Sequence, residues 1–240
     1  QTPKAYHNGV LWGGAATSLY KSTDHWMTLE LVHSFPAGST FRDLLIVKDD
    51  IMIAGIDHTI MRTTDGGTTF QTVLTAMHEG SSFGLRSLAR QIDGVLYAAT
   101  YGDKTPSNTE VFRSEDDGAT WVKVLDLLDS FPEAINPTGA HIHGIHSDPY
   151  TSDLWLLVGD QPNSSIFRCP GGLDVSKPSN WQLLSHATLS PVEFEGYPGH
   201  VAHQPIDAWF DDEYAYFSND QAPWAVKRYH KGSGVWDLAL

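Results

Sequence analysis

The sequence predicts an all-β protein assembled from repeated units of four short strands. A polar motif recurs along the chain, short apolar runs flank turn residues such as Asp93-Gly94, and no segment keeps a 3.6-residue apolar period. The 240 residues are 41% hydrophobic and include 8 Trp, 9 Tyr and 10 Phe. That composition excludes a disordered chain and is sufficient for one domain with a sizeable core.

The recurring motif has the order Ser/Thr, any residue, Asp, any residue, Gly, any residue, Thr, aromatic. Its copies lie at residues 22–29, 63–70 and 114–121, with two eroded copies at 168–181 and 228–236. Trp26 takes the place of the glycine in the first copy. An Asp in this position caps the following backbone N–H groups, and Gly supplies a positive φ. We therefore interpret the motif as a structural hairpin turn followed by a buried aromatic anchor.

Each complete motif follows two apolar runs joined by a turn. In the second unit these runs are 44–47 and 51–54. The repeat is therefore four strands in about 48 residues, and such repeats are typical of a β-propeller with radial blades. We predict five blades, at approximately 1–35, 36–77, 78–130, 131–188 and 189–240. A six-bladed ring or a truncated larger propeller is the alternative.

The motif resembles the Asp-box, or BNR, repeat of sialidases and related β-propellers. The resemblance implies a sialidase-like architecture in which the Asp boxes lie on the face opposite the ligand site. It does not imply the activity of a typical sialidase. The segment Phe41-Arg42-Asp43-Leu44 departs from the Phe/Tyr-Arg-Ile-Pro motif of sialidases at its last two positions. The three-arginine cluster and the Tyr/Glu pair of sialidases cannot be assigned either.

In the geometry that this resemblance implies, the inner strands and the ends of the second strands meet at one mouth of the central channel. Counting back from the turn after each inner strand gives a set of cationic and imidazole side chains: Arg42, Arg86, His143 and His203. The ends of the second strands give a set of carboxylates: Asp57, Asp103, Asp160 and Asp220. The structural interpretation is that these residues line a water-filled channel and cap turns.

Histidines are concentrated in two segments, 141–146 and 200–203. Alternate strand residues such as His141 and His143 lie about 6.5–7 Å apart on one face. Together with His200 and His203 they predict a site for one divalent metal ion (Zn, Mn or Ni), which Asp103 or Asp160 would complete. The alternatives are uncoordinated acid/base histidines and a plain polar lining. No organic cofactor is expected.

Our first functional hypothesis is a glycan-active enzyme, which the resemblance favours: a glycoside hydrolase or polysaccharide lyase acting on an acidic polysaccharide. The catalytic candidates are His143, His203, Asp160 and Asp103. The candidates for substrate binding are Arg42, Arg86, Tyr101, Tyr197 and Trp224. Arginines hold carboxylates or sulfates by paired hydrogen bonds, and aromatic rings stack on sugars.

Two alternatives remain: a non-catalytic module that binds a carbohydrate or a receptor, as in a phage or cell-surface protein, and a scaffold for protein assembly. The net charge of −14 argues against a nucleic-acid partner, and no apolar run reaches the length of a membrane helix. The chain begins with Gln1, so we expect a processed chain or part of a larger one. We expect it to be secreted, on the cell surface or associated with a virion.

Overall fold

The computed structural model describes residues 2–76, 82–102, 109–160, 163–186, 204–220 and 226–239. These residues form five antiparallel sheets of four strands each, so the predicted fold class and the number of blades are confirmed. A four-residue helix, α1 (Leu127–Ser130), and a short 3-10 helix at Pro178–Asn180 lie between strands. No helix in the described part of the chain is long and apolar enough to cross a membrane.

Within each sheet the strands are in sequence order. The first sheet contains β1 (Thr2–His7), β2 (Val10–Ala15), β3 (Ser18–Ser22) and β4 (Glu30–Ser34). The second contains β5 (Phe41–Ile46), β6 (Met52–Ile56), β7 (Thr59–Thr63) and β8 (Gln71–Thr75). The third contains β9 (Ser82–Arg90), β10 (Leu96–Tyr101), β11 (Glu110–Ser114) and β12 (Val122–Asp126). The fourth contains β13 (His141–Ser147), β14 (Leu154–Gly159), β15 (Ser165–Cys169) and β16 (Gln182–His186). The fifth contains β17 (Pro205–Phe210), β18 (Tyr214–Asn219), β19 (Val226–His230) and β20 (Trp236–Ala239).

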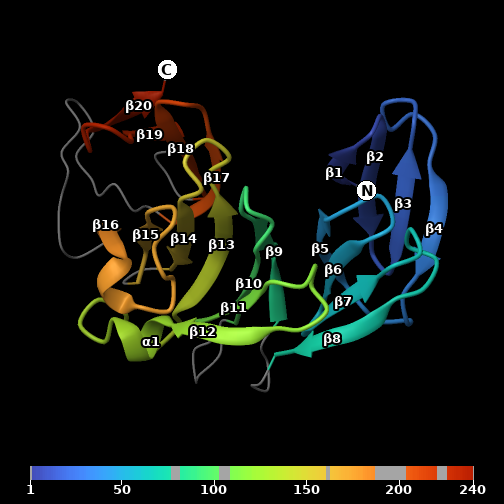
Figure 1. Cartoon of the computed structure of the whole chain (residues 1–240), viewed down its shortest axis with the longest axis horizontal. Coiled ribbons are helices and arrows are strands. Elements are labelled where there is room, and N and C mark those ends of the chain that lie inside the picture. Colours follow the sequence, from blue (N-terminus) through green and yellow to red (C-terminus); the bar gives the residue numbers. More distant parts are fainter. Residues whose placement is uncertain are drawn as a thin grey trace.

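The sheets follow one another around an arc, with the first strand of each sheet on the inside (Figure 1). Along the inside, β1 contacts β5, β5 contacts β9, β9 contacts β13, and β13 contacts β17. The first and fifth sheets stand at the two ends of the arc (Figure 1). This radial arrangement of twisted antiparallel sheets is that of a β-propeller, and it gathers the five inner strands around one central channel.

Burial along the second strands follows from this arrangement. Every residue of β6 and of β14 is buried, because neighbouring sheets cover both faces of these strands. In β18, at one end of the arc, Ala215 and Phe217 are buried whereas Tyr214 and Tyr216 are half-buried. The buried face of the fifth sheet packs on Trp155 of the fourth. The core is thus a series of apolar layers between successive sheets.

The Asp of each complete motif has the structural role that the sequence predicts. Asp65 accepts hydrogen bonds from the backbone N–H of Thr69 (2.9 Å), from the Thr69 hydroxyl (2.6 Å) and from the Thr63 hydroxyl (2.7 Å). Asp24 and Asp116 make the same set of contacts in their own turns. Hydrogen bonds from the Thr four residues later lower the pKa of each of these carboxyl groups to about 2. These three residues are therefore part of the scaffold.

The glycine of the motif has a packing role that gives the first testable prediction. Gly118 has φ +80°, and a Cβ atom there would lie 2.3 Å from Cδ1 of the fully buried Ile53 in the neighbouring sheet. Gly94 also has a positive φ, of +93°, but an added Cβ would meet nothing within 4 Å. We expect Gly94→Ala to cost about 1–2 kcal/mol of backbone strain, and Gly118→Ala about 1–3 kcal/mol more because of the overlap.

Urea unfolding of the two variants measures this difference. Ile53→Val removes the Cδ1 atom, so it should reduce the extra cost when combined with Gly118→Ala. Equal destabilisation by the two alanine substitutions would contradict the packing role of Gly118.

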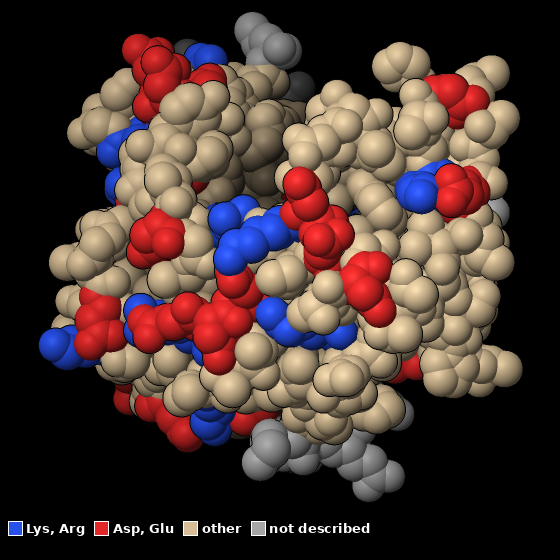
Figure 2. Space-filling model, turned by 45° about the vertical axis from the view of Figure 1, so that its right-hand side comes forward, with Lys and Arg blue, Asp and Glu red and all other residues tan. Residues whose placement is uncertain are grey.

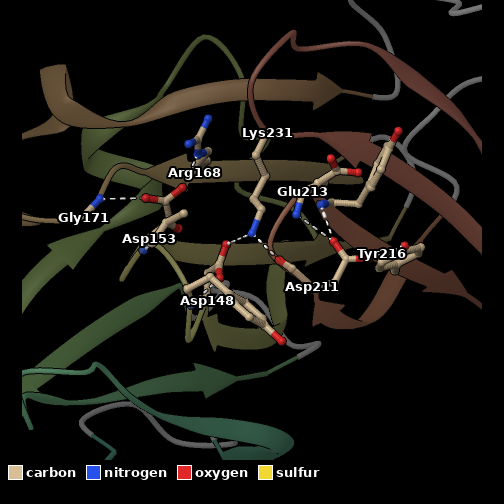
Figure 3. A network of polar contacts seen from close by, with 11 residues as sticks. Asp148, Asp153, Arg168, Gly171, Asp211, Glu213, Tyr216 and Lys231 are labelled. Carbon is tan, nitrogen blue, oxygen red and sulfur yellow. Dashed lines mark hydrogen bonds and ion pairs between the residues drawn. The ribbon is translucent and has the colours of Figure 1, made fainter.

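The fourth and fifth sheets, where the motif is eroded, use a different set of polar contacts (Figure 3). Asp153 accepts hydrogen bonds from Nε of Arg168 (2.6 Å) and from the backbone N–H of Gly171 (2.8 Å). Lys231 donates to the carboxylate of Asp148 (2.8 Å) and to the carbonyl oxygen of Asp211 (2.5 Å). The Lys231 contacts join the turn after β13 to the turn after β17. The ion pair between Lys231 and Asp148 therefore connects the fifth sheet to the fourth.

Candidate functional site

The inner strands carry β-bulges at similar positions, opposite the last residues of the second strands. In four of them a single extra residue interrupts the ladder with the second strand: Lys4, Arg42, His143 and Ile206. In β9 the interruption is longer, and residues 84–87 lie opposite Ala99 alone. A bulge turns a side chain out of the regular alternation of its strand. Here it directs residues of successive sheets toward the central channel.

A pocket of about 290 Å³ lies where these bulges meet. Its lining is drawn from β5, β9, β10, β13 and β17 and from the end of β18, and comprises Arg42, Ser82, Phe83, Gly84, Leu85, Arg86, Tyr101, His143, Ile206 and Asp220. The structure therefore brings together Arg42, Arg86, Tyr101 and His143, which the sequence analysis singles out.

The equivalent of Arg42 in the fifth sheet is Ile206, not His203. In both strands three residues lie between the bulge and the last paired residue, but the turns that follow differ in length. Asp49 is the third residue of its turn, whereas Asp211 is the first, so counting back from these residues shifts the register. His203 itself lies outside the described residues, as do four other candidates: Asp103, Tyr197, His200 and Trp224.

Two imidazoles on β13 are fixed by backbone carbonyl groups. Nδ1 of His141 lies 2.9 Å from the carbonyl oxygen of Gly139, and Nδ1 of His143 lies 2.9 Å from that of Pro205. A carbonyl oxygen only accepts hydrogen bonds, so each Nδ1 must carry a proton, and in the neutral form of each imidazole the lone pair is on Nε2. Both side chains are buried, with exposed fractions of 2% and 8%.

Both lone pairs converge on the carboxylate of Asp160, which follows β14. Its oxygens lie 3.9 Å from Nε2 of His141 and 3.6 Å from Nε2 of His143. One ligand atom from each of the three residues lies within 4.8 Å of the others. Nε2 of His141 is buried and has no hydrogen-bond partner. Three acceptors without a donor between them suit a cation, and an Nδ1–H bonded to a carbonyl is usual for metal-bound histidine. The group could therefore hold a metal ion.

The surroundings of His143 favour its neutral form, which is the form that binds metals. Burial lowers the pKa of His143, and the neighbouring His141 lowers it further. The ring of Tyr101 lies edge-on to His141, with centroids 4.7 Å apart, and nearly parallel to His143 at 6.3 Å. Tyr101 thus forms one wall beside both imidazoles.

The His143 ring lies directly over Gly159 at the end of β14. A Cβ atom at Gly159 would lie 2.0 Å from Cε1 of His143 and 2.1 Å from its Nε2. We expect Gly159→Ala to displace the imidazole and break its hydrogen bond to Pro205. A long-range ¹H–¹⁵N spectrum should show the Nδ1–H tautomer of His143 in the wild type and its loss in the variant.

Gly55→Ala is the matched control, because an added Cβ there meets nothing closer than 3.5 Å. An unchanged His143 tautomer in Gly159→Ala would show that the ring does not lie over Gly159.

A second polar group lies at the border between β9, β13 and β17. Nε of Arg86 lies 2.7 Å from Oδ2 of Asp207, and Nε2 of His146 lies 3.8 Å from Oδ1 of the same carboxylate. Burial lowers the pKa of His146 to about 4, against the opposing effect of Asp207. The sequence analysis did not select Asp207 or His146. Asp207 could have been found from its position in the repeat, because Asp43 and Asp207 both directly follow the bulged residue of their inner strand.

The four carboxylates at the ends of the second strands have different surroundings. Asp57 accepts a hydrogen bond from the backbone N–H of Thr40 (2.9 Å) and has a φ of +48°, so it caps a turn. Asp160 faces the two imidazoles, and Asp220 lines the pocket. Asp103 is outside the described residues. Being at the end of a second strand therefore does not by itself make an Asp a site residue.

No protein-family model matches this sequence, and no curated protein is similar to it in sequence. Its fold is similar to that of an ancestral GH74 enzyme, with a TM-score of 0.68 and 14% identity over 100% of this chain and 31% of that chain. It is also similar to YCF48 bound to a D1 peptide, with a TM-score of 0.60 and 16% sequence identity. That match covers 98% of this chain and 66% of YCF48. A calcium-binding regucalcin from Agrobacterium tumefaciens has a TM-score of 0.63 and 13% sequence identity. That match covers 95% of this chain and 69% of the regucalcin chain.

These solved structures are β-propellers, which agrees with the arrangement described above. The chain spans less than two thirds of the length of YCF48 and about a third of the length of the GH74 enzyme. At these identities the similarity shows the fold alone.

Proposed function

We propose that the protein binds one divalent metal ion at His141, His143 and Asp160 and cleaves an acidic polysaccharide held in the adjoining pocket. The convergence of two imidazole lone pairs on one carboxylate, with both Nδ1 protons bonded to backbone carbonyls, carries this proposal. Two nitrogen ligands and one oxygen ligand favour zinc, manganese or nickel over calcium, which prefers oxygen ligands alone.

The rest of the pocket suits a carboxylated sugar. Arg42 and Arg86 line it, and each can pair with a carboxylate of the polymer through two hydrogen bonds, while Tyr101 offers an aromatic face to a sugar ring. A bound metal ion would supply further positive charge next to the carboxylate at Arg86, which lies beside β13. Stabilising a uronate carboxylate makes the neighbouring C–H more acidic, which is what eliminative cleavage requires.

Elimination is the form of cleavage that we propose. Glycoside hydrolysis generally uses two carboxyl groups on opposite sides of the scissile bond. Asp220 is the one carboxylate in the described lining of the pocket, which includes neither Asp160 nor Asp207. Asp220 is therefore the described candidate for proton transfer, and His203 and Asp103 remain candidates from the sequence. Binding without cleavage is the second possibility, since the YCF48 neighbour is seen with a bound peptide.

A metal-dependent cleavage assay tests the proposal. Metal-free protein is supplied with Zn²⁺, Mn²⁺ or Ni²⁺ and incubated with polygalacturonate, with alginate or with neutral xyloglucan. We expect the ultraviolet absorbance of unsaturated uronate to rise only with metal and an acidic polymer, and to be abolished by Arg42→Gln. Lys48→Gln, at an exposed residue paired with Asp117, is the control. Metal-dependent binding without product would identify a binding protein, and no binding of any acidic polymer would contradict the proposal.

A further inference from the structure

Two cationic side chains are exceptional in this acidic protein. The chain has 29 Asp and Glu against 15 Lys and Arg, and the space-filling view shows most cationic groups directly beside acidic ones (Figure 2). Among the described residues, every Lys and Arg other than Lys4 and Arg42 makes an ion pair, a hydrogen bond or another polar contact. With the residues that the structure describes, Lys4 and Arg42 make neither an ion pair nor a hydrogen bond, and Nε of Arg42 is buried.

These two residues occupy the same structural position on neighbouring inner strands. Lys4 is the bulged residue of β1, and Arg42 is the bulged residue of β5. The bulged residues of β5, β13 and β17 all line the pocket, so the register places Lys4 on the same inner side of the arc. The charge of Lys4 also acts on the buried carboxyl group of Asp43, which directly follows Arg42. Lys4 and Arg42 therefore lie on adjacent strands on the inside of the arc, and neither makes a close ion pair or a hydrogen bond with a described residue.

This arrangement differs from that of Arg86. The guanidinium of Arg86 is already paired with Asp207 at 2.7 Å, so part of its charge is neutralised within the protein. Lys4 and Arg42 make no comparable close ion pair with a described carboxylate, although the charge of Lys4 also acts on Asp43. An uncompensated, partly desolvated charge is unfavourable unless a ligand completes it.

We infer that Lys4 and Arg42 form a second anion subsite, two to three sheets around the arc from the His141–His143–Asp160 group. The ligand then carries at least two anionic groups, as an acidic oligosaccharide with charges on successive sugars does. This inference rests on the proposed function for the first anionic group, which sits near the metal site. It names Lys4, a residue that the sequence analysis did not select, as a determinant of ligand length.

The test compares ligands of increasing length. Affinities of metal-loaded wild type and of Lys4→Gln are measured by calorimetry for galacturonate and for its disaccharide and tetrasaccharide. We expect Lys4→Gln to weaken tetrasaccharide binding by about tenfold and to leave monosaccharide binding unchanged, because only the longer ligand reaches the second subsite. Lys4→Arg should restore the affinity, and Lys48→Gln should behave as the wild type. Thermal unfolding of each variant checks that the fold is intact.

The outcomes separate this inference from the proposed function. If Lys4→Gln matches the wild type at every ligand length, or loses the same factor at all lengths, the second subsite is wrong while the metal site stands. If the protein binds no stoichiometric metal but tetrasaccharide binding still depends on Lys4, the metal site is wrong and the subsite stands. Absence of binding by all of the acidic ligands overturns both.

Discussion

Replacing Lys231 with methionine is expected to lower the free energy of unfolding by about 3–5 kcal/mol. The Nζ atom of Lys231 lies 2.8 Å from the carboxylate of Asp148, whose side chain is 0% exposed, and it also donates to the carbonyl oxygen of Asp211 (Figure 3). Methionine has a similar volume but no charge. The substitution therefore leaves an uncompensated carboxylate inside the protein, which costs far more than the ion pair contributes to stability.

Urea unfolding followed by tryptophan fluorescence measures the effect. Lys48→Met is the control, because the Lys48 side chain is 58% exposed and its ion pair with Asp117 should contribute less than about 1 kcal/mol. Adding Asp148→Asn to Lys231→Met removes the buried charge and should recover part of the loss. If Lys231→Met stays within about 1 kcal/mol of the wild type, Lys231 does not neutralise Asp148 in the folded protein.

Removing the imidazole of His143 is expected to weaken binding of the proposed metal ion by at least about 100-fold. The substitution His143→Ala removes one of the two nitrogen ligands, and the loss should exceed the effect of disturbing an outer hydrogen bond. Asp160→Asn keeps an oxygen near the imidazoles but removes its charge, so we expect a smaller loss of about tenfold. Competition with a chromophoric chelator measures both affinities.

His58→Ala is the matched control, since His58 is exposed and does not belong to this group. Equal metal affinity of His143→Ala and the wild type would show that any bound metal lies elsewhere.

Local sequence patterns predict the fold well because the stabilising contacts are themselves local. Asp65 and its partners lie within six residues of one another, and the hairpins are joined by short turns with residues such as Asp93-Gly94. Each sheet is built from consecutive strands, so the repeat in the sequence translates directly into the repeat in space. The prediction of five four-stranded units needs no long-range information.

The site depends on contacts that local patterns do not contain. The tautomer of His143 is set by the carbonyl oxygen of Pro205, 62 residues away in the chain. The level of each bulge is set by pairing with the second strand, so counting from turns of different length misplaces the equivalent of Arg42 at His203 and overlooks Lys4. The pairing of Arg86 with Asp207 joins two sheets that are not consecutive in the chain.

The most direct test of the account is the coordination of the bound metal. X-ray absorption spectroscopy on wild-type protein loaded with one equivalent of Zn²⁺ should show two imidazole nitrogens at about 2.0–2.1 Å and at least one carboxylate oxygen at about 2.0–2.2 Å. His141→Ala should remove one imidazole from that spectrum. A wild-type protein that retains no stoichiometric metal, or a spectrum without imidazole ligands, would contradict the claim that His141, His143 and Asp160 form a metal site.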